Sequence, residues 1–321
     1  MIELSTSIQL GTWNVCVIAS SDTQASLKNF IEQFQAFSIR RPQQDEKSRY
    51  LLLISPKILE ENFLPSCLAA DDRIEWKAFY SALLIGYRQF LQQRVENATK
   101  TNRAFVFLWP PQNQNKGSDI QNTREKRFLA FSIENPKEEA AYLKIFGYMI
   151  FLANTWHIER GGLCVHSAAV SRNGQGFLFL GDSGAGKSTT ARLSVEAGCL
   201  ALGDDLNFIL SHEKHGYSLA ASPSPILSSV GYSMIQPGLQ GIFTLVQDKK
   251  DYLVSLSPKQ TAIALFDSFQ KQTPYTRRFS DQLVKKAFHT IADIARCVPA
   301  YELHFRKTPD FWKQIHEKFP G

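Results

Sequence analysis

One octapeptide, residues 181–188, limits what this chain can fold into more than any other segment. It matches the phosphate-binding loop G-x-x-x-x-G-K-[ST], in which backbone N–H groups face a phosphate, the lysine reaches the β and γ oxygens, and the hydroxyl ligates Mg²⁺. Such a loop joins a buried strand to a helix, so we expect an α/β fold that binds a nucleotide. The expected nucleotide-binding residues are Gly181, Asp182, Ser183, Gly184, Ala185, Gly186, Lys187, Ser188 and Thr189.

The residues on both sides of the loop supply the required context. An apolar run over 177–180 predicts the strand, and residues 187–197 predict a short helix that ends before Gly198. Residues 163–170 form a second strand-like run, and the Asn-Gly pair at 173–174 between the two runs is a hairpin-turn signal. The strand before the loop is therefore expected to be the second arm of a hairpin.

Two adjacent carboxylates follow the next predicted strand. The run over 199–202 is apolar and leads into Gly203, Asp204 and Asp205, which places the acids where ligands of open α/β sheets bind. Either carboxylate could accept the proton of an attacking hydroxyl or ligate Mg²⁺, and the sequence does not order the pair. Because neighbouring carboxylates raise each other's proton affinity, we expect a strong Mg²⁺ dependence. The expected metal ligands are Ser188, Asp204 and Asp205.

Three segments together resemble the catalytic domain of bacterial HPr kinase/phosphorylase: His166-Ser167-Ala168-Ala169-Val170, the octapeptide, and Asp204-Asp205. The resemblance covers about residues 140–315. It implies a P-loop kinase domain of the HPr kinase/PEP carboxykinase type, α/β in class with a mixed α+β sheet, and ATP and Mg²⁺ as cofactors. It also implies that the three segments meet at the γ-phosphate, with His166 as a catalytic residue beside Asp204 and Asp205.

Two departures from that family bear on the substrate. Thr189 stands where the HPr enzymes carry Glu, and no counterpart of their Glu-Ile-Arg-Gly segment follows downstream. HPr itself is therefore a poor candidate substrate. The chain is more similar to the HPr-kinase-related proteins of peptide-modification cassettes, such as lasso-peptide kinases and the SynChlorMet cassette protein, whose targets would be a peptide hydroxyl.

These observations predict an ATP-dependent serine kinase that transfers the γ-phosphate to a hydroxyl of a small protein or peptide. Two alternatives stay open: an ATP-binding regulatory or recognition module without phosphoryl transfer, and a small-molecule kinase that uses the same site. The acidic pair favours transfer, because a conformational switch needs no proton acceptor. Since Lys187 contacts phosphate, we expect its side chain to be exposed while no nucleotide is bound.

Length and composition indicate a two-domain protein. The 321 residues exceed one typical domain, and 44% hydrophobic with 21% charged residues is ordinary globular usage. We set the boundary near residue 136. Residues 1–135 are interpreted as an N-terminal α/β domain for substrate or partner recognition, and residues 136–321 as the catalytic domain.

Periodicity predicts further elements in both regions. In the N-terminal region we expect strands over 13–20, 50–55 and 128–131 and helices over 22–37 and 76–95. In the catalytic region we expect a buried helix over 145–156 and two hairpins, one pairing 206–210 with 217–221 and one pairing 242–246 with 252–256.

The remaining features exclude several classes of function. The five cysteines are scattered without C-x-x-C spacing, which argues against a zinc site or a disulfide framework. The N-terminus shows no signal-peptide pattern, and the run over 145–156 is too short for a bilayer, so we expect a cytoplasmic protein without a membrane partner. Residues 271–321 carry ten Lys and Arg against five Asp and Glu, which suits an acidic peptide. No nucleic-acid-binding motif is present, so no nucleic-acid partner is expected, and a homo-oligomer stays open.

Overall fold

The computed structural model describes residues 4–11, 13–19, 38–39, 50–54, 104–109, 128–133, 139–212, 216–222, 233–271 and 281–320. The helices predicted over 22–37 and 76–95 lie outside these residues. The chain divides into two compact units, one of Met1–Gln9 with Asn14–Met149 and one of Leu10–Trp13 with Ile150–Gly321. Within the described residues, no helix combines the length and the apolar character that crossing a membrane requires.

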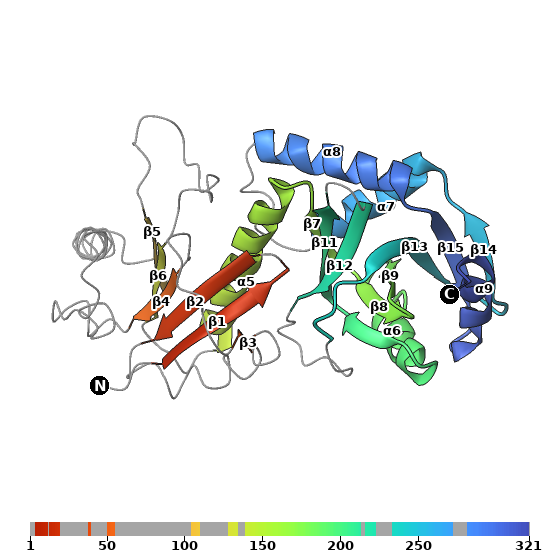
Figure 1. Cartoon of the computed structure of the whole chain (residues 1–321), viewed down its shortest axis with the longest axis horizontal. Helices are drawn as coiled ribbons and strands as arrows, with labels where there is room; N and C mark the ends of the chain where they lie inside the picture. Colours follow the sequence, from red (N-terminus) through yellow and green to blue (C-terminus); the bar gives the residue numbers. More distant parts are fainter. Residues whose placement is uncertain are drawn as a thin grey trace. The chain divides into compact units, whose positions relative to one another are not determined.

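The first unit contains a six-stranded mixed sheet in the order β3-β1-β2-β4-β6-β5 (Figure 1). β2, β4 and β6 run parallel to one another, while β3 and β5 pair antiparallel with β1 and β6. The strands predicted over 13–20, 50–55 and 128–131 are confirmed. The bounds are Leu4–Leu10 (β1), Trp13–Ala19 (β2), Ser38–Ile39 (β3), Tyr50–Ile54 (β4), Ala104–Trp109 (β5) and Phe128–Ile133 (β6).

The second unit is built on a nine-stranded mixed sheet, as expected. Its order is β10-β8-β9-β13-β12-β11-β7, with β15 beside β13 and β14 beside β15. β13 runs parallel to β9 and β15, and the other pairs are antiparallel. The bounds are Leu163–His166 (β7), Ala168–Arg172 (β8), Gln175–Leu180 (β9), Leu200–Gly203 (β10), Leu206–His212 (β11), Gly216–Ala221 (β12), Gly238–Gln247 (β13), Tyr252–Ser255 (β14) and Ala300–Phe305 (β15).

The hairpin before the loop is confirmed, with one correction. β8 pairs antiparallel with β9 across Asn173 and Gly174, whose φ values of 51° and 76° are those of a tight hairpin turn. The run over 163–170, however, is not one strand. It breaks at Ser167, where the backbone N–H donates to the Asp205 carbonyl oxygen at 2.9 Å instead of continuing a ladder. β7 consequently pairs with β11, while β8 pairs with β9 and β10.

Of the two other predicted hairpins, one is confirmed and one is wrong. β11 and β12 pair antiparallel from Asn207↔Ala221 to His212↔Gly216. The runs over 242–246 and 252–256 are strands, but β15 lies between them, parallel to β13 and antiparallel to β14. The prediction failed because β13 and β14 each pair with β15, which comes about fifty residues later in the sequence, and not with each other.

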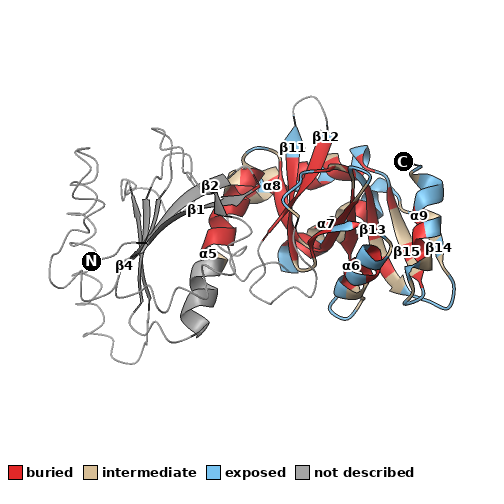
Figure 2. Cartoon of the chain, turned by 60° about the horizontal axis from the view of Figure 1, so that its bottom comes forward, coloured by how far each residue is buried: buried red, intermediate tan, exposed pale blue. Residues whose placement is uncertain are grey.

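Helices cover both faces of this sheet. α6 (Lys187–Glu196), the short 3₁₀ helix η3 (Pro309–Phe311) and α9 (Trp312–Lys318) contribute to a buried hydrophobic cluster rich in aromatic residues on one face. Figure 2 shows that the strands of this unit are largely buried while parts of α6 and α9 are exposed. In that cluster Phe179 stacks on Phe243 with ring centroids 5.4 Å apart. α7 (Pro258–Lys271) contacts β7 and β9, and α8 (Asp281–Cys297) packs on α7. The buried helix expected over 145–156 is confirmed within α5, Glu139–Ile158.

Candidate functional site

The octapeptide forms the turn between β9 and α6, as its sequence predicts. Gly184 and Gly186 have φ values of 82° and 111°, in the left-handed region. A Cβ on Gly184 would meet no heavy atom within 4 Å, so the crest of the loop faces open space. No side chain caps the N-terminus of α6 at Gly186. An uncapped helix N-terminus beneath an open loop fits the binding of an anion such as a phosphate.

Lys187 lies folded onto its own loop. Its Nζ donates to the carbonyl oxygens of Gly181 and Asp182 at 3.0 and 3.1 Å. The side chain is buried, so the expectation that it would be exposed is wrong: the ammonium satisfies its hydrogen bonds on backbone carbonyls rather than in water. Burial lowers the pKa of Lys187, and the nearby Asp205 carboxylate opposes that shift.

Two neighbouring strands hold the loop from the side. Gln247, the last residue of β13, donates through Nε2 to the Gly184 carbonyl oxygen at 2.9 Å. Phe305, the last residue of β15, leaves no space at Gly186, where a Cβ would stand 3.0 Å from the ring. Only glycine combines the left-handed backbone at position 186 with this close approach.

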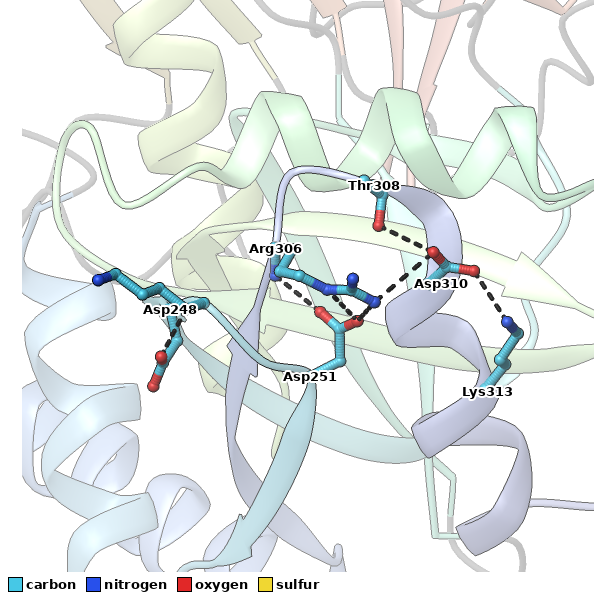
Figure 3. Close-up of polar contacts among 7 residues, drawn as sticks. Asp248, Asp251, Arg306, Thr308, Asp310 and Lys313 are labelled. Atoms are coloured by element: carbon cyan, nitrogen blue, oxygen red, sulfur yellow. Dashed lines mark hydrogen bonds and ion pairs between the residues drawn. The ribbon is translucent and has the colours of Figure 1, made fainter.

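A polar network fixes the chain directly after Phe305 (Figure 3). Asp251 accepts hydrogen bonds from the backbone N, Nε and Nη2 of Arg306 at 2.7, 2.9 and 2.6 Å. Asp310 lies on the other side of the guanidinium, 3.6 Å from Nη2, and also pairs with Lys313 at 2.9 Å. The Asp251 side chain is only 7% exposed, so this pair is shielded from solvent on one side. The network anchors the end of β15 and with it the ring that faces the loop.

The structure brings together the three segments that the sequence singled out. His166 ends β7, and its Nδ1 lies 3.1 Å from Oδ1 of Asp205 in the turn between β10 and β11. Both side chains are about one quarter exposed, at 26% and 25%. The charge of Asp205 also raises the pKa of Lys187 in the loop, against the effect of burial. Asp204 is half-buried in the same turn. The two aspartates therefore differ in their surroundings, because it is Asp205 that contacts His166.

Asn207 holds this turn in place and was not identified from the sequence. Its Nδ2 donates to the carbonyl oxygen of Ser167 at 2.8 Å and lies 3.1 Å from the Ser167 hydroxyl. The side chain is completely buried. Since Ser167 follows His166 and Asn207 lies two residues after Asp205, these bonds tie both members of the pair together. A polar residue inside an otherwise apolar run, 206–210, was the available signal.

We expect Asn207→Ala to lower the free energy of unfolding by about 2 kcal/mol, because it removes buried hydrogen bonds and leaves Ser167 partly unsatisfied. Urea denaturation followed by tryptophan fluorescence measures the change. Ser211→Ala, at an exposed position of the same strand, is the matched control and should stay within about 0.5 kcal/mol of the parent protein. Equal unfolding midpoints for the two variants would show that the Asn207 bonds do not stabilise the turn.

The donors near the loop suit Mg²⁺ in a phosphate site, where one or two carboxylates combine with phosphate oxygens and water. Ser188 is exposed at the start of α6, and Asp204 and Asp205 are both accessible in part. Among the described residues, no three His, Cys, Asp or Glu side chains gather as a metal cluster. Of the residues that the structure describes, Ser188 and one or both aspartates are the expected side chains that could ligate Mg²⁺ here.

Comparison with known proteins gives one finding. Residues 133–319, more than half of the chain, match the SynChlorMet cassette protein ScmC family. None of the curated proteins matches the chain. The expected similarity to cassette proteins is confirmed by this match, which begins at the last residue of β6 and includes the loop, His166 and both aspartates.

Proposed function

The chain belongs to the SynChlorMet cassette protein ScmC family, and from this premise and the site geometry we propose that it is an ATP-dependent kinase. It would transfer the γ-phosphate to a serine-type hydroxyl of a small protein or peptide, in the manner of the HPr-kinase-like P-loop enzymes that its sequence resembles. The observation that carries the proposal is the Asp205–His166 contact of 3.1 Å, together with an octapeptide that has the sequence of a phosphate-binding loop. A loop that only bound nucleotide would need no such proton acceptor.

The loop would hold the triphosphate, and Lys187 would turn from the carbonyls of Gly181 and Asp182 to the phosphate oxygens. Both partners it leaves are backbone carbonyl oxygens, so no buried charge is left unpaired when the ammonium moves. Ser188 and Asp204 would hold Mg²⁺, which would supply charge neutralisation on the phosphates and leave Asp205 for the acceptor hydroxyl.

Asp205 would act as the general base. The acceptor oxygen attacks the γ-phosphorus, the bond from that phosphorus to the β–γ bridging oxygen breaks, and the hydroxyl proton passes to the Asp205 carboxylate. His166, through Nδ1, would hold that carboxylate in one orientation during the transfer. ADP carries away the electron pair of the broken bond. Positioning and charge neutralisation account for most of the rate enhancement in such reactions.

The first 132 residues lie outside the family match. We propose that they recognise the acceptor protein or peptide, since sequence that differs from the shared catalytic region is where specificity for a partner can reside.

We also propose that the protein acts in the cytoplasm. Cys164, Cys199 and Cys297 are free thiols, as is usual for cysteines in the reducing environment of the cytoplasm.

Incubation of the full chain with Mg²⁺, ATP labelled at the γ-phosphate and peptides encoded in the native gene neighbourhood tests the function. We expect label on a peptide serine or threonine, located by mass spectrometry, and much slower labelling with the Asp205→Asn variant. Label on a small molecule instead would identify a small-molecule kinase. Nucleotide binding without any transfer would leave the regulatory module as the function.

A further inference from the structure

α7 connects the two halves of the candidate site. Ser268 on this helix is buried, and its hydroxyl donates to the carbonyl oxygen of His166 at 2.7 Å. One turn later, the Nζ of Lys271 forms an ion pair with the carboxylate of Asp182, the second residue of the loop. The same helix therefore contacts the strand end that carries His166 and presents a cation at the phosphate-binding loop.

The ion pair has little to contribute to stability. The side chains of Lys271 and Asp182 are 44% and 83% exposed, and pairs of this kind are screened by water. Lys271 does hold the pKa of Asp182 below its usual value, through the hydrogen bond first and through its charge second. Asp182 is thus ionised beside a loop that would receive a polyanion, where an uncompensated carboxylate would repel the phosphates.

Two ammonium groups consequently lie at one loop. The Nζ of Lys187 and that of Lys271 both contact Asp182, the first at the backbone carbonyl and the second at the carboxylate. The charges of Asp205, Lys271 and Asp182 all act on Lys187, so the four groups form one electrostatic cluster. Lysine suits an exchange of partners, because its ammonium has three donors on a flexible stem.

We propose that Lys271 is a second phosphate-binding residue, which leaves the Asp182 carboxylate for a terminal phosphate oxygen when a nucleoside triphosphate occupies the loop. The inference rests on the proposed function, since it requires that the loop binds nucleotide. A phosphate with two or more negative charges is a stronger acceptor for an ammonium than an exposed carboxylate. Lys271 thereby adds a phosphate contact from α7, the helix whose Ser268 also bonds to the carbonyl oxygen of His166.

Four variants of the full chain test this: Lys271→Gln, Asp182→Asn, the double variant, and Lys259→Gln as a matched control. Lys259 is exposed on the first turn of the same helix. Isothermal titration with ATP, ADP and AMP in Mg²⁺ buffer gives the affinities, and thermal unfolding shows that each variant is folded. We expect Lys271→Gln to weaken ATP binding about tenfold and AMP binding much less, since one charge-assisted contact is lost. Asp182→Asn should tighten ATP binding several-fold, and Lys259→Gln should match the parent protein.

The double variant separates phosphate binding from mere neutralisation of Asp182. If Lys271 contacts phosphate, Lys271→Gln weakens ATP binding about tenfold in the D182N background as well. If Lys271 only neutralises Asp182, its loss has no effect in that background, and this result would overturn the proposal. Unchanged ATP affinity of the single Lys271→Gln variant would also overturn it, while leaving the proposed kinase function intact. A folded parent protein that binds none of the three nucleotides would overturn both.

Discussion

Phosphoryl transfer by the Asp205→Asn variant is expected to be slower than that of the parent protein by a factor of about 10² to 10⁴, the range that removal of a general base produces. The amide keeps the size of the carboxylate and a hydrogen-bonding group toward His166, but it cannot accept the proton of the acceptor hydroxyl. Single-turnover measurement with γ-labelled ATP gives the rate of the chemical step directly.

Asp204→Asn is the matched control, because it changes the neighbouring residue of the same turn. We expect a smaller loss, since Asp205 is the aspartate that contacts His166 at 3.1 Å. Both variants should bind ATP. If both transfer phosphate at the parental rate, neither carboxylate is the base, and a nucleotide-binding regulatory module replaces the kinase as the best interpretation. A larger loss in Asp204→Asn would assign the base to Asp204.

ATP affinity is expected to fall by about 100-fold or more in Lys187→Met, because ammonium contacts to the phosphates are lost and charged hydrogen bonds contribute about 1.5–3 kcal/mol each. Methionine retains the apolar stem of this buried side chain. The substitution removes the donor to only two acceptors, the carbonyl oxygens of Gly181 and Asp182, and both lie beside an exposed loop. The fold should therefore be preserved.

Calorimetric titration with Mg-ATP measures the affinity, and thermal unfolding without nucleotide checks the fold. Lys307→Met, an exposed lysine in the loop after β15, controls for the general loss of one positive charge. Parental affinity in Lys187→Met would mean that the octapeptide does not bind phosphate, and the proposed function would fail with it.

Local sequence signals account for most of the second unit. The turn at Asn173-Gly174 has the backbone that its residue types favour, and α6 ends at Glu196, one residue before the predicted end. β11 and β12 were likewise visible as two runs joined by a short connection. In each of these elements the partners are close in sequence, so the local preference and the final pairing agree.

Long-range pairing was the part that local signals could not supply. β15 lies between β13 and β14 because it fits their edges better than they fit each other. The residues of the runs over 242–246 and 252–256 do not show which distant strand each will pair with. The break at Ser167 has the same origin, because its N–H bonds to the turn at Asp205, which is far away in the chain.

The candidate site likewise contains some residues that the sequence predicted and others that it did not. The residues of the loop predicted it directly. The family resemblance predicted that His166 lies near the two aspartates, and the structure shows its contact with Asp205. Ser268 and Lys271 gave no signal, because an exposed lysine at a helix end is ordinary in any sequence. Gln247 was equally inconspicuous at the end of a strand, although its amide contacts Gly184 in the loop.

The support beneath α6 has a consequence for how the protein is made. The Trp312 indole N–H donates to the Ser194 hydroxyl of α6 at 3.0 Å, and Phe311 and Ile315 complete the aromatic cluster under that helix. β15, whose Phe305 limits the space at Gly186, also follows the octapeptide by more than a hundred residues. During translation the octapeptide thus leaves the ribosome more than a hundred residues before the groups that support it. We expect a nascent chain to acquire nucleotide affinity late, when these segments emerge and the second unit can fold as a whole.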